Sequence, residues 1–534
     1  MAAEGKVFIG ISFGTLYSSI AILGKNGLAE AIANEDGDRQ IPSYVAFCGH
    51  GEELAGSQAR VQAMSNPTGT IVQFRNLLGK TFDDEEVQAH SQKLPMNIVA
   101  SPEDATVPVY EVESYPDDSD EPVRDHHSVV EVSAKYLRKL KETAENFLGT
   151  PVDGVVISIP AHFEDVQKAA LMQATKEAGF ETAYPVHEPV AAALAFDAAT
   201  GATSSPASTK IDKNVLVLDL GGHQFNVTAL ANNAGIYTVL ASKDDPALGG
   251  VHFDEILMNF VKQEFKRKTK LDVSDNRRAL SKLRSACDQT KRSLSRQDSA
   301  PCSVESLCEG MDYHGNINRN RFEMLAEPLY ARAATVIHAT LEEANVPIDR
   351  VDEVLFVGGS SRMPRFQTAV KSLFPNAALR TDVEPDEAIS TGCATQAAIL
   401  LASTTDYPAA AINKDITDAR HVAKTLGVEV AGGAFAPLIP AHAPIPARRT
   451  AVFGVSADGQ REIFVAVYEG EDAVAKKNTL LAEVVLSDLP EGLNRGEGNV
   501  EVTFTIEQDQ VLTVLAKEKT TGHHVRVKVN HHHK

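Results

Sequence analysis

The stretch IGISFGTLYSSIAIL, residues 9–23, consists of an apolar strand, a glycine turn and a second, alternating strand. A glycine turn after a strand presents backbone N–H groups to a phosphate without a Cβ in the way. The same pattern returns in VLVLDLGGHQFNVTAL, which begins at Val215. Gly14 and Gly221 are separated by roughly 200 residues, about the length of one compact lobe. The pattern therefore predicts one phosphate-gripping hairpin in each of two lobes.

Two more glycine turns follow predicted strands, LGG at residues 248–250 and VGGSSRMP at residues 357–364. A single glycine turn is most often only a tight turn. Four of them in one region favour a nucleotide-binding site over four unrelated turns.

The order of strands and helices divides the chain into regions of different class. Up to Ala402, strand-like runs such as GVVISIP alternate with helical patterns such as VSAKYLRKLKETAENFL, which is typical of α/β layers. Short alternating runs such as VEVTFTIE then predict a small β-sandwich. We expect a two-lobed α/β domain over residues 1–402, a linker over 403–434 and the sandwich over 435–530. No helical pattern follows the last strand, so no helical lid is expected.

Composition narrows the function classes. A formal charge of −21 over 534 residues argues against direct binding to nucleic acid or to an acidic membrane. The N-terminus lacks the pattern of a signal peptide, and no window has the length of a membrane span. Five scattered cysteines without a Cys-x-x-Cys pair indicate reduced thiols. These features predict a cytoplasmic protein; the final HHHK is a metal-chelating run or a tag remnant.

The carboxylates are distributed unequally between the two hairpins. A triphosphate hydrolase needs oxygen ligands for hydrated Mg²⁺ and a group that orients the attacking water. Asp219, before the second turn, is placed to hold a metal through water, and no other metal ligand is assigned. The equivalent position in the first hairpin is Ser12, which is neutral and cannot act as a base. The need for Mg²⁺ therefore stays open.

The segment ACDQTKRSLS places four polar residues at helical spacings of three and four, so they share one helix face. They are Asp288, Lys291, Arg292 and Ser295. Taken alone, this face is either solvated or a binding surface.

Ordered motifs resemble a known family. VISIPAHFEDVQKAALMQATKEAGF, VHEPVAAALAF, LGGVHFDE, RALSKLRSACDQTKRSLS, VGGSSRMPRFQ and EPDEAISTGCATQAAIL match, in this order, the ATPase domain of the seventy-kilodalton heat-shock chaperones. LIPAHAPIPARRTAVFGVSADGQ and VEVTFTIEQDQVLTVLAKEKTTG resemble the peptide-binding β-domain of the same family. The resemblance implies an actin-like, two-lobed ATPase domain that binds ATP, followed by a truncated peptide-binding-like sandwich.

The resemblance also implies site residues and exposes departures. The nucleotide would be bound by Gly14, Thr15, Leu16, Tyr17, Gly221, Gly222, His223, Gly249, Gly250, Asp288, Lys291, Arg292, Ser295, Gly358, Gly359, Ser360, Arg362 and Asp386. Glu188 and Asp219 are retained from the catalytic positions, whereas Ser12 replaces an aspartate, Arg75 a lysine and Gln224 a threonine. His223 replaces a glycine, and Asp288 replaces a glutamate. No active catalytic residue is therefore expected.

These departures, a linker without a leucine run and the expected lack of a lid resemble the Ssz-type subunit of the fungal ribosome-associated complex. That resemblance implies a co-chaperone that binds ATP without appreciable hydrolysis and pairs stably with a zuotin-type J-domain protein. The ribosome would be reached through this partner, while contact with nascent polypeptide stays open. The alternative is a slow but active ATP-hydrolysing chaperone that uses Asp219, Glu188 and a bound water. A nucleotide-exchange partner is a further interpretation that fits the sequence less well, because such relatives usually carry long insertions and an extended helical end.

Overall fold

A computed structural model describes residues 6–24, 27–114, 123–199, 213–233, 236–403, 422, 424–439, 447–487, 489–490, 495–496, 500–506 and 511–530. The chain divides into two compact units, a large N-terminal one and a smaller one made mainly of residues after Asp406. Among the described helices, none combines the length and the apolar character needed to cross a membrane.

The first lobe of the large unit contains a mixed sheet in the order β12-β11-β1-β2-β3, with β4 paired to β2. β1 runs antiparallel to β2 and parallel to β11. The strands are β1 (Phe8–Ser12), β2 (Tyr17–Leu23), β3 (Ala29–Ile32), β4 (Ile41–Pro42), β11 (Gly154–Ile159) and β12 (Thr182–His187). Ile9, Ile11 and Ile20 are fully buried in its core, because helices cover the sheet.

The second lobe repeats this arrangement, in the order β15-β14-β13-β18-β19. Its strands are β13 (Lys213–Leu220), β14 (Phe225–Asn233), β15 (Ile236–Asp245), β18 (Glu353–Val357) and β19 (Ala378–Arg380). β13, the counterpart of β1, pairs in parallel with β18, as β1 does with β11. The hairpin repeat predicted from the two glycine turns is therefore present in the topology, and the sheets are mixed α/β as expected.

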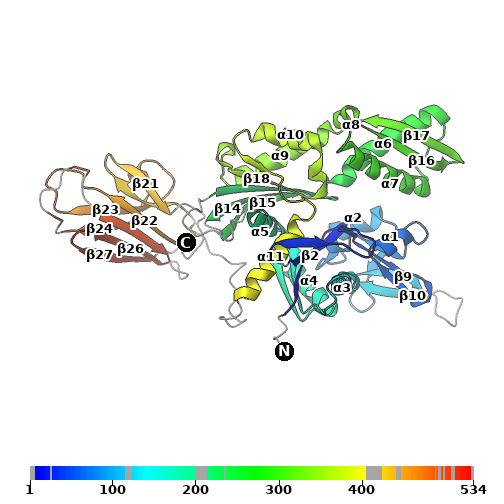
Figure 1. The fold of residues 1–534 in the computed structure, drawn as a ribbon, viewed down its shortest axis with the longest axis horizontal. Coiled ribbons are helices and arrows are strands. Elements are labelled where there is room, and N and C mark those ends of the chain that lie inside the picture. Colours follow the sequence, from blue (N-terminus) through cyan, green and yellow to red (C-terminus); the bar gives the residue numbers. More distant parts are fainter. Residues whose placement is uncertain are drawn as a thin grey trace. The chain divides into compact units, whose positions relative to one another are not determined.

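Helices pack closely on these sheets. α11 (Ala388–Ser403) lies against β1 and α5 (Glu188–Ala199). This approach depends on two glycines: a Cβ on Gly10 would collide with the Ala394 nitrogen, and one on Gly392 with the Ala191 carbonyl. α3 (Val129–Leu148) begins where the Ser128 side chain accepts a hydrogen bond from the Glu131 N–H. In Figure 1, α9 and α10 lie along the second sheet, while α6, α7, β16 and β17 gather at its far end.

The remaining elements of the large unit complete the two lobes. In the first lobe these are α1 (Ser57–Gln62), α2 (Glu85–Lys93), α4 (Asp165–Glu177), β5 (Tyr44–Phe47), β6 (Glu53–Ala55), β7 (Thr70–Val72), β8 (Asn97–Ala100), β9 (Pro108–Ser114), β10 (Val123–Ser128), η1 (Gly49–Gly51) and η2 (Phe74–Leu77). In the second they are α6 (Gly250–Thr269), α7 (Arg277–Leu294), α8 (Arg319–Leu325), α9 (Glu327–Glu343), α10 (Pro364–Leu373), β16 (Ser299–Cys308), β17 (Met311–Asn318), η5 (Ile348–Arg350) and η6 (Gly359–Arg362).

The small unit contains two four-stranded sheets, β21-β20-β23-β24 and β22-β25-β26-β27. One apolar cluster takes side chains from both sheets, including Val467 and Phe504, so they form a sandwich core. Its elements are β20 (Leu426–Val430), β21 (Ala434–Ile439), β22 (Ala447–Phe453), β23 (Ile463–Glu469), η8 (Ala475–Lys477), β24 (Thr479–Leu486), β25 (Val500–Ile506), β26 (Val511–Glu518) and β27 (His524–Asn530).

The sandwich begins earlier than predicted. β20 lies inside the range expected to be linker, 403–434, and the prediction is wrong there. Val428 is buried and pairs with Val467 of β23, a contact between segments distant in sequence that local patterning does not reveal. Residues 404–421 of that range, like the histidine run at 531–534, lie outside the described residues.

Candidate functional site

The two hairpin turns face one another. In the first, the Gly14 N–H donates to Ser18 Oγ at 3.2 Å. In the second, the Gly221 N–H donates to the Gln224 carbonyl at 3.1 Å. A Cβ on Gly222 would lie 2.6 Å from Cδ1 of Leu16. Leu16 therefore joins the turn of one lobe to the turn of the other.

The other two glycine turns converge on the second hairpin. The Gly250 N–H, at the start of α6, donates to the Gly221 carbonyl at 3.0 Å. A Cβ on Gly250 would lie 2.7 Å from Ser360 Oγ. Gly358 has a φ of +79°, and a Cβ there would lie 2.6 Å from Asp219 Oδ1. All four turns therefore share one site, and backbone approaches this close require glycine.

The four turns together form a glycine cradle, and two neighbouring glycines, Gly249 and Gly359, complete it. Gly249 caps α6, and a Cβ there would collide with the His223 backbone. Gly359 begins η6, where a Cβ would lie 3.9 Å from the Cβ of Asp386. Thr15, in the first turn, donates from Oγ1 to Asn76 Oδ1 at 3.1 Å.

The predicted polar face of α7 is formed, and its members pair with one another. Lys291 Nζ lies 2.8 Å from Asp254 Oδ1 on α6 and donates to the Gly250 carbonyl at 3.0 Å. Arg292 Nε donates to both carboxylate oxygens of Asp288 at 3.0 and 3.1 Å. Ser295, one turn on, donates to the Lys291 carbonyl at 3.3 Å. Lys291 thus links this face to the glycine cradle.

Burial and the neighbouring cations shift the pKa values of the carboxylates on and beside this face. Burial would raise the pKa of Asp288, but Lys291 and Arg292 outweigh it and lower the pKa. Burial raises the pKa of Asp254 to about 6, although Lys291 opposes the shift. Asp288 is therefore the carboxylate that stays ionised over the whole physiological range.

Tyr17 joins α7 to the first hairpin. Its hydroxyl accepts from Arg292 Nη2 at 3.4 Å and from Arg60 Nη1 at 3.0 Å. Both guanidinium groups also lie over its ring, 5.6 and 5.8 Å from the centroid. Arg362 forms a separate cluster, paired with Asp386 and with Glu384.

The region around the expected catalytic positions contains a pair that the sequence did not predict. Arg75 Nη2 donates to Glu188 Oε1 at 2.6 Å, and these side chains are only 8% and 7% exposed. Glu188 begins α5, where the helix dipole favours negative charge. Motif matching identified both residues, but not their pairing, because they are distant in sequence.

Asp219 lies at the end of β13, opposite Val357. Removal from water raises its pKa to about 7, and the nearby Glu188 adds to this; Arg75 and a hydrogen bond from Asn226 oppose the shift. Gln224 donates to Asn226 Oδ1 at 3.0 Å. Ser12 ends β1, where it pairs with Ser19 of β2.

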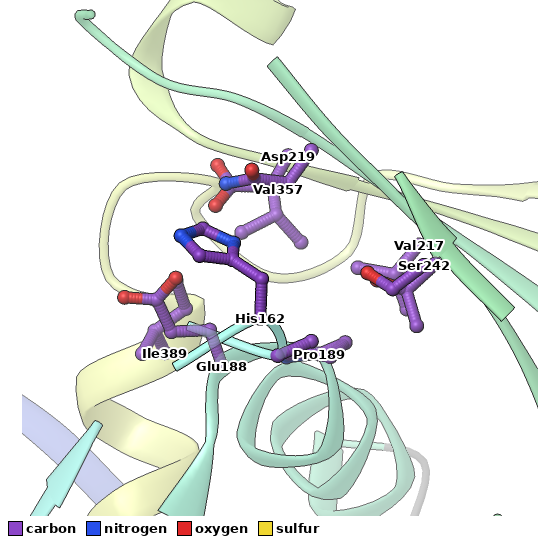
Figure 2. A pocket seen from close by; sticks show the side chains of 11 residues that line it. His162, Glu188, Pro189, Val217, Asp219, Ser242, Val357 and Ile389 are labelled. Carbon is purple, nitrogen blue, oxygen red and sulfur yellow. The ribbon is translucent and has the colours of Figure 1, made fainter. Parts of the chain in front are cut away.

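Glu188 and Asp219 line one cavity with His162, Pro189 and Val217. In Figure 2 the His162 ring projects between the two carboxyl groups. His162 lies within the matched motif IPAHFED, but nothing in that motif distinguishes it from its neighbours.

The residues present fit a nucleotide. At Gly222, Gly249, Gly250 and Gly358 the cradle leaves no room for a Cβ atom. The Nδ1 atoms of His223 and His252 are buried without hydrogen-bond partners among the described residues. A phosphate in the cradle would supply acceptors. In the described part of the chain, no group of three or more His, Cys, Asp or Glu side chains is arranged to ligate a metal directly.

Known proteins resemble the chain over nearly its whole length. The model of the Hsp70 protein family matches residues 8–534. Heat shock cognate 70 kDa protein 3 of Dictyostelium discoideum is 36% identical, over 96% of this chain and 78% of the relative. The heat shock 70 kDa protein of Neurospora crassa is 36% identical, over 96% of this chain and 76% of the relative. Heat shock 70 kDa protein BIP3 of Oryza sativa subsp. japonica is 37% identical, over 98% of this chain and 75% of the relative. With this coverage and its glycine cradle, the chain belongs to the Hsp70 family of ATP-binding chaperones.

Proposed function

We propose that the chain is a ribosome-associated co-chaperone subunit that binds ATP without appreciable hydrolysis and forms a stable complex with a zuotin-type J-domain protein. The buried Arg75–Glu188 ion pair is the observation that carries the first part. Arg75 occupies the position of the family's catalytic lysine, yet its charge is already neutralised by Glu188. Breaking a buried pair costs roughly 3–5 kcal/mol, so Arg75 is poorly available to a terminal phosphate.

The other changed positions also favour ATP binding without appreciable hydrolysis. Phosphoryl transfer relies on positive charge at the transferred group and on an oriented water. Ser12 adds no charge, and the planar guanidinium of Arg75 does not substitute for a compact ammonium. Bound ATP would supply binding energy that stabilises the folded state, while the cradle and α7 hold it.

Single-turnover hydrolysis by the purified chain tests this proposal. We expect ATP to remain intact while raising the melting temperature, since a ligand at a hundredfold excess over Kd adds roughly 2.7 kcal/mol. Ser12→Asp alone should leave turnover unchanged, because groups that act as a unit are non-additive. The triple variant Ser12→Asp, Arg75→Lys, Gln224→Thr should gain turnover. Phosphate release by the unmodified chain at the rate of an active relative would overturn the proposal.

A slow, active chaperone is the second candidate. In its favour, Asp219, with a pKa raised to about 7, shares a cavity with Glu188 and His162. A water in that cavity would have a proton acceptor near neutral pH. Slow phosphate formation that disappears in Asp219→Asn would establish this alternative.

The partner part of the proposal is supported by the sandwich. Phe464 is 68% exposed and pairs in register with the exposed Val485 on β24. β24 ends its sheet in strand order. An apolar patch beside a terminal strand suits an extended segment that adds as a further strand. We assign this position to a segment of the J-domain protein.

Co-purification of the full chain with the J-domain protein tests the assignment. Phe464→Ser should weaken the complex, whereas Val452→Ser, at an exposed position on β22 of the other sheet, should not. Equal recovery of both variants would move the interface elsewhere.

Ribosome sedimentation tests the adaptor role. The chain alone should stay in the supernatant, because its charge of −21 opposes contact with RNA, and should sediment only with the partner. Salt-sensitive ribosome binding by the chain alone would contradict this role.

A further inference from the structure

Two half-buried histidines flank the glycine cradle, and one nitrogen of each ring, Nδ1, has no hydrogen-bond partner among the described residues. His223 follows Gly222 in the second hairpin turn, and His252 is the third residue of α6. Their ring centroids lie 6.2 Å apart. Each Nδ1 is buried and has no hydrogen-bond partner among the described residues. Leaving a buried polar atom unpaired costs about 1–3 kcal/mol, so such atoms usually serve a purpose.

A third histidine from the other lobe shows the same deficiency. His90, on α2, is only 9% exposed, and its Nε2 also lacks a partner in the described part of the chain. Its pKa is lowered to about 4, mainly by burial, and the proximity of His223 contributes. Lys93, on the same helix, acts on both His90 and His223.

The charged groups that act on the pair are Lys93, Asp245 and Arg332. His223 has a lowered pKa because of burial, then because of His252 and Lys93. The Asp245 carboxylate of β15 is near enough to His252 for electrostatic interaction, and Arg332 Nη2 of α9 donates to it at 2.8 Å. Arg332 therefore offsets the negative charge of Asp245 beside this pair. An anion is the ligand that this surrounding lacks.

A buried core pair and a metal site are the competing interpretations. Core histidines normally find partners for their nitrogens, whereas the Nδ1 atoms of this pair have none among the described residues. Ligation of a metal is disfavoured, because the described residues offer no cluster of three suitable side chains. An anion would satisfy both rings at once, since protonated imidazole donates from both nitrogens.

We propose that His223 and His252 form a subsite for the terminal phosphate of the nucleotide, and that occupation of this subsite is coupled to uptake of a proton by the pair. This inference rests on the proposed ATP binding and names the side chains that would balance the charge of the terminal phosphate. Imidazolium groups would supply positive charge at the second hairpin, while Ser12 in the first hairpin supplies no carboxylate for a hydrated metal. Nucleotide affinity should therefore depend little on Mg²⁺.

The direction of the pH dependence follows from linkage. In the free chain His223 is neutral at pH 7, because its pKa lies below the ordinary value. A phosphate favours the charged form and raises this pKa in the complex. Affinity should then fall as the pH rises through the pKa of the complex, by up to about tenfold per pH unit for each proton taken up.

Two other groups also change affinity with pH. The terminal phosphate itself titrates near pH 6, and the negative charge it gains above that pH opposes the expected fall in affinity. Asp219 gains negative charge above about pH 7. Matched variants are therefore needed, and we choose His223→Gln and His252→Gln, with His314→Gln as control. His314 lies on β17 with its side chain 65% exposed.

Calorimetric titration of the full chain with ATP in EDTA, at about pH 6 and about pH 8, provides the test. Two buffers with different ionisation enthalpies at each pH give the number of protons taken up. The wild type and His314→Gln should take up the same number. His223→Gln and His252→Gln should each take up fewer and lose about tenfold in affinity at the lower pH only. Unchanged proton uptake in both variants would overturn the inference.

Titration with adenosine separates the possible failures. Adenosine has no phosphate, so it should bind the wild type without proton uptake. Uptake with adenosine equal to that with ATP would exclude the phosphate subsite, even if the variants did not fold. If ATP does not bind the wild type at either pH, the proposed function fails instead.

Discussion

An arginine–carboxylate ion pair lies on each of two sides of the nucleotide site, the α7 side and the phosphate side. The two pairs differ in how deeply they are buried. On α7, Arg292 is 59% exposed while it pairs with Asp288. On the phosphate side, Arg75 and Glu188 are 8% and 7% exposed. An exposed pair exchanges its partner for a ligand at a cost of about 0–1 kcal/mol, whereas a buried pair resists by several kcal/mol. The proposed separation of nucleotide binding from hydrolysis therefore rests on this difference in burial.

Removing one member of the buried pair should produce the largest effect. Glu188→Ala leaves the Arg75 guanidinium buried without its partner, so the free energy of unfolding of the large unit should fall by about 3–5 kcal/mol. Urea denaturation measures it. The double variant Arg75→Met, Glu188→Gln should recover most of the loss, because no unpaired charge remains.

The control for this comparison is an exposed pair. Arg39 lies 3.2 Å from Glu387 and is 57% exposed, so Arg39→Ala should cost under about 1 kcal/mol. If Glu188→Ala costs no more than Arg39→Ala, the difference in depth between the two sides has no energetic meaning.

The glycine cradle should respond almost as strongly. Gly358→Ala combines a positive φ with a collision against the Leu220 carbonyl, and we expect a loss of about 2–4 kcal/mol. Gly37 has a φ of +85° with no atom within 4 Å of an added Cβ. Gly37→Ala should therefore cost only the backbone strain, about 1 kcal/mol. Equal losses by thermal unfolding would show that the close approach at Gly358 is not rigid.

Much of this molecule could be predicted from its sequence, because local patterns specify local structure. The glycine turns after Ser12 and Asp219 predicted the repeated hairpins, and helical spacing placed Asp288 and Arg292 on one face. The family resemblance supplied the identity of the altered positions. These inferences needed only neighbouring residues or an existing pattern.

The remainder depends on contacts between distant segments. Nothing local to Arg75 or Glu188 indicates that they meet, and their pairing depends on where η2 and α5 lie in the folded lobe. β20 was assigned to the linker because its strand partners follow it in the chain. His90 lies in no quoted motif, and His252 lies inside LGGVHFDE, where the motif gives it no separate role. Only the folded structure shows that His90 Nε2 and His252 Nδ1 lack partners among the described residues.

A smaller effect on stability is expected at Asp219. The pKa of Asp219 is raised to about 7, above its unfolded value, so its stabilising contribution is present at low pH and is lost as pH rises to neutrality. Asp219→Asn should therefore be more stable than wild type above pH 7, by about 1 kcal/mol after allowance for solvent screening. Near pH 4 the two should melt together.

Asp272 provides a control of opposite sign. It is exposed, and its pKa is lowered by hydrogen bonds from Lys266 and Ser274. Asp272→Asn should destabilise the chain at neutral pH and not in acid. The same sign for both variants in a series of melts at increasing pH would contradict the raised pKa of Asp219.

The smallest effect on stability is expected at Arg292, where the exposed pair should affect the ligand rather than the fold. Without Arg292, water can solvate the Asp288 carboxylate, so Arg292→Ala should cost under about 1 kcal/mol in unfolding free energy. Loss of a planar cation that can stack on a base should weaken ATP binding by about two- to fivefold. Calorimetry and melting with and without ATP separate these quantities, and Arg296→Ala, an exposed arginine just after α7, is the matched control. If Arg292→Ala unfolds the chain as Glu188→Ala does, both sides are structural. If it leaves ATP affinity equal to that of Arg296→Ala, α7 is a solvated face and the nucleotide is held by the glycine cradle alone.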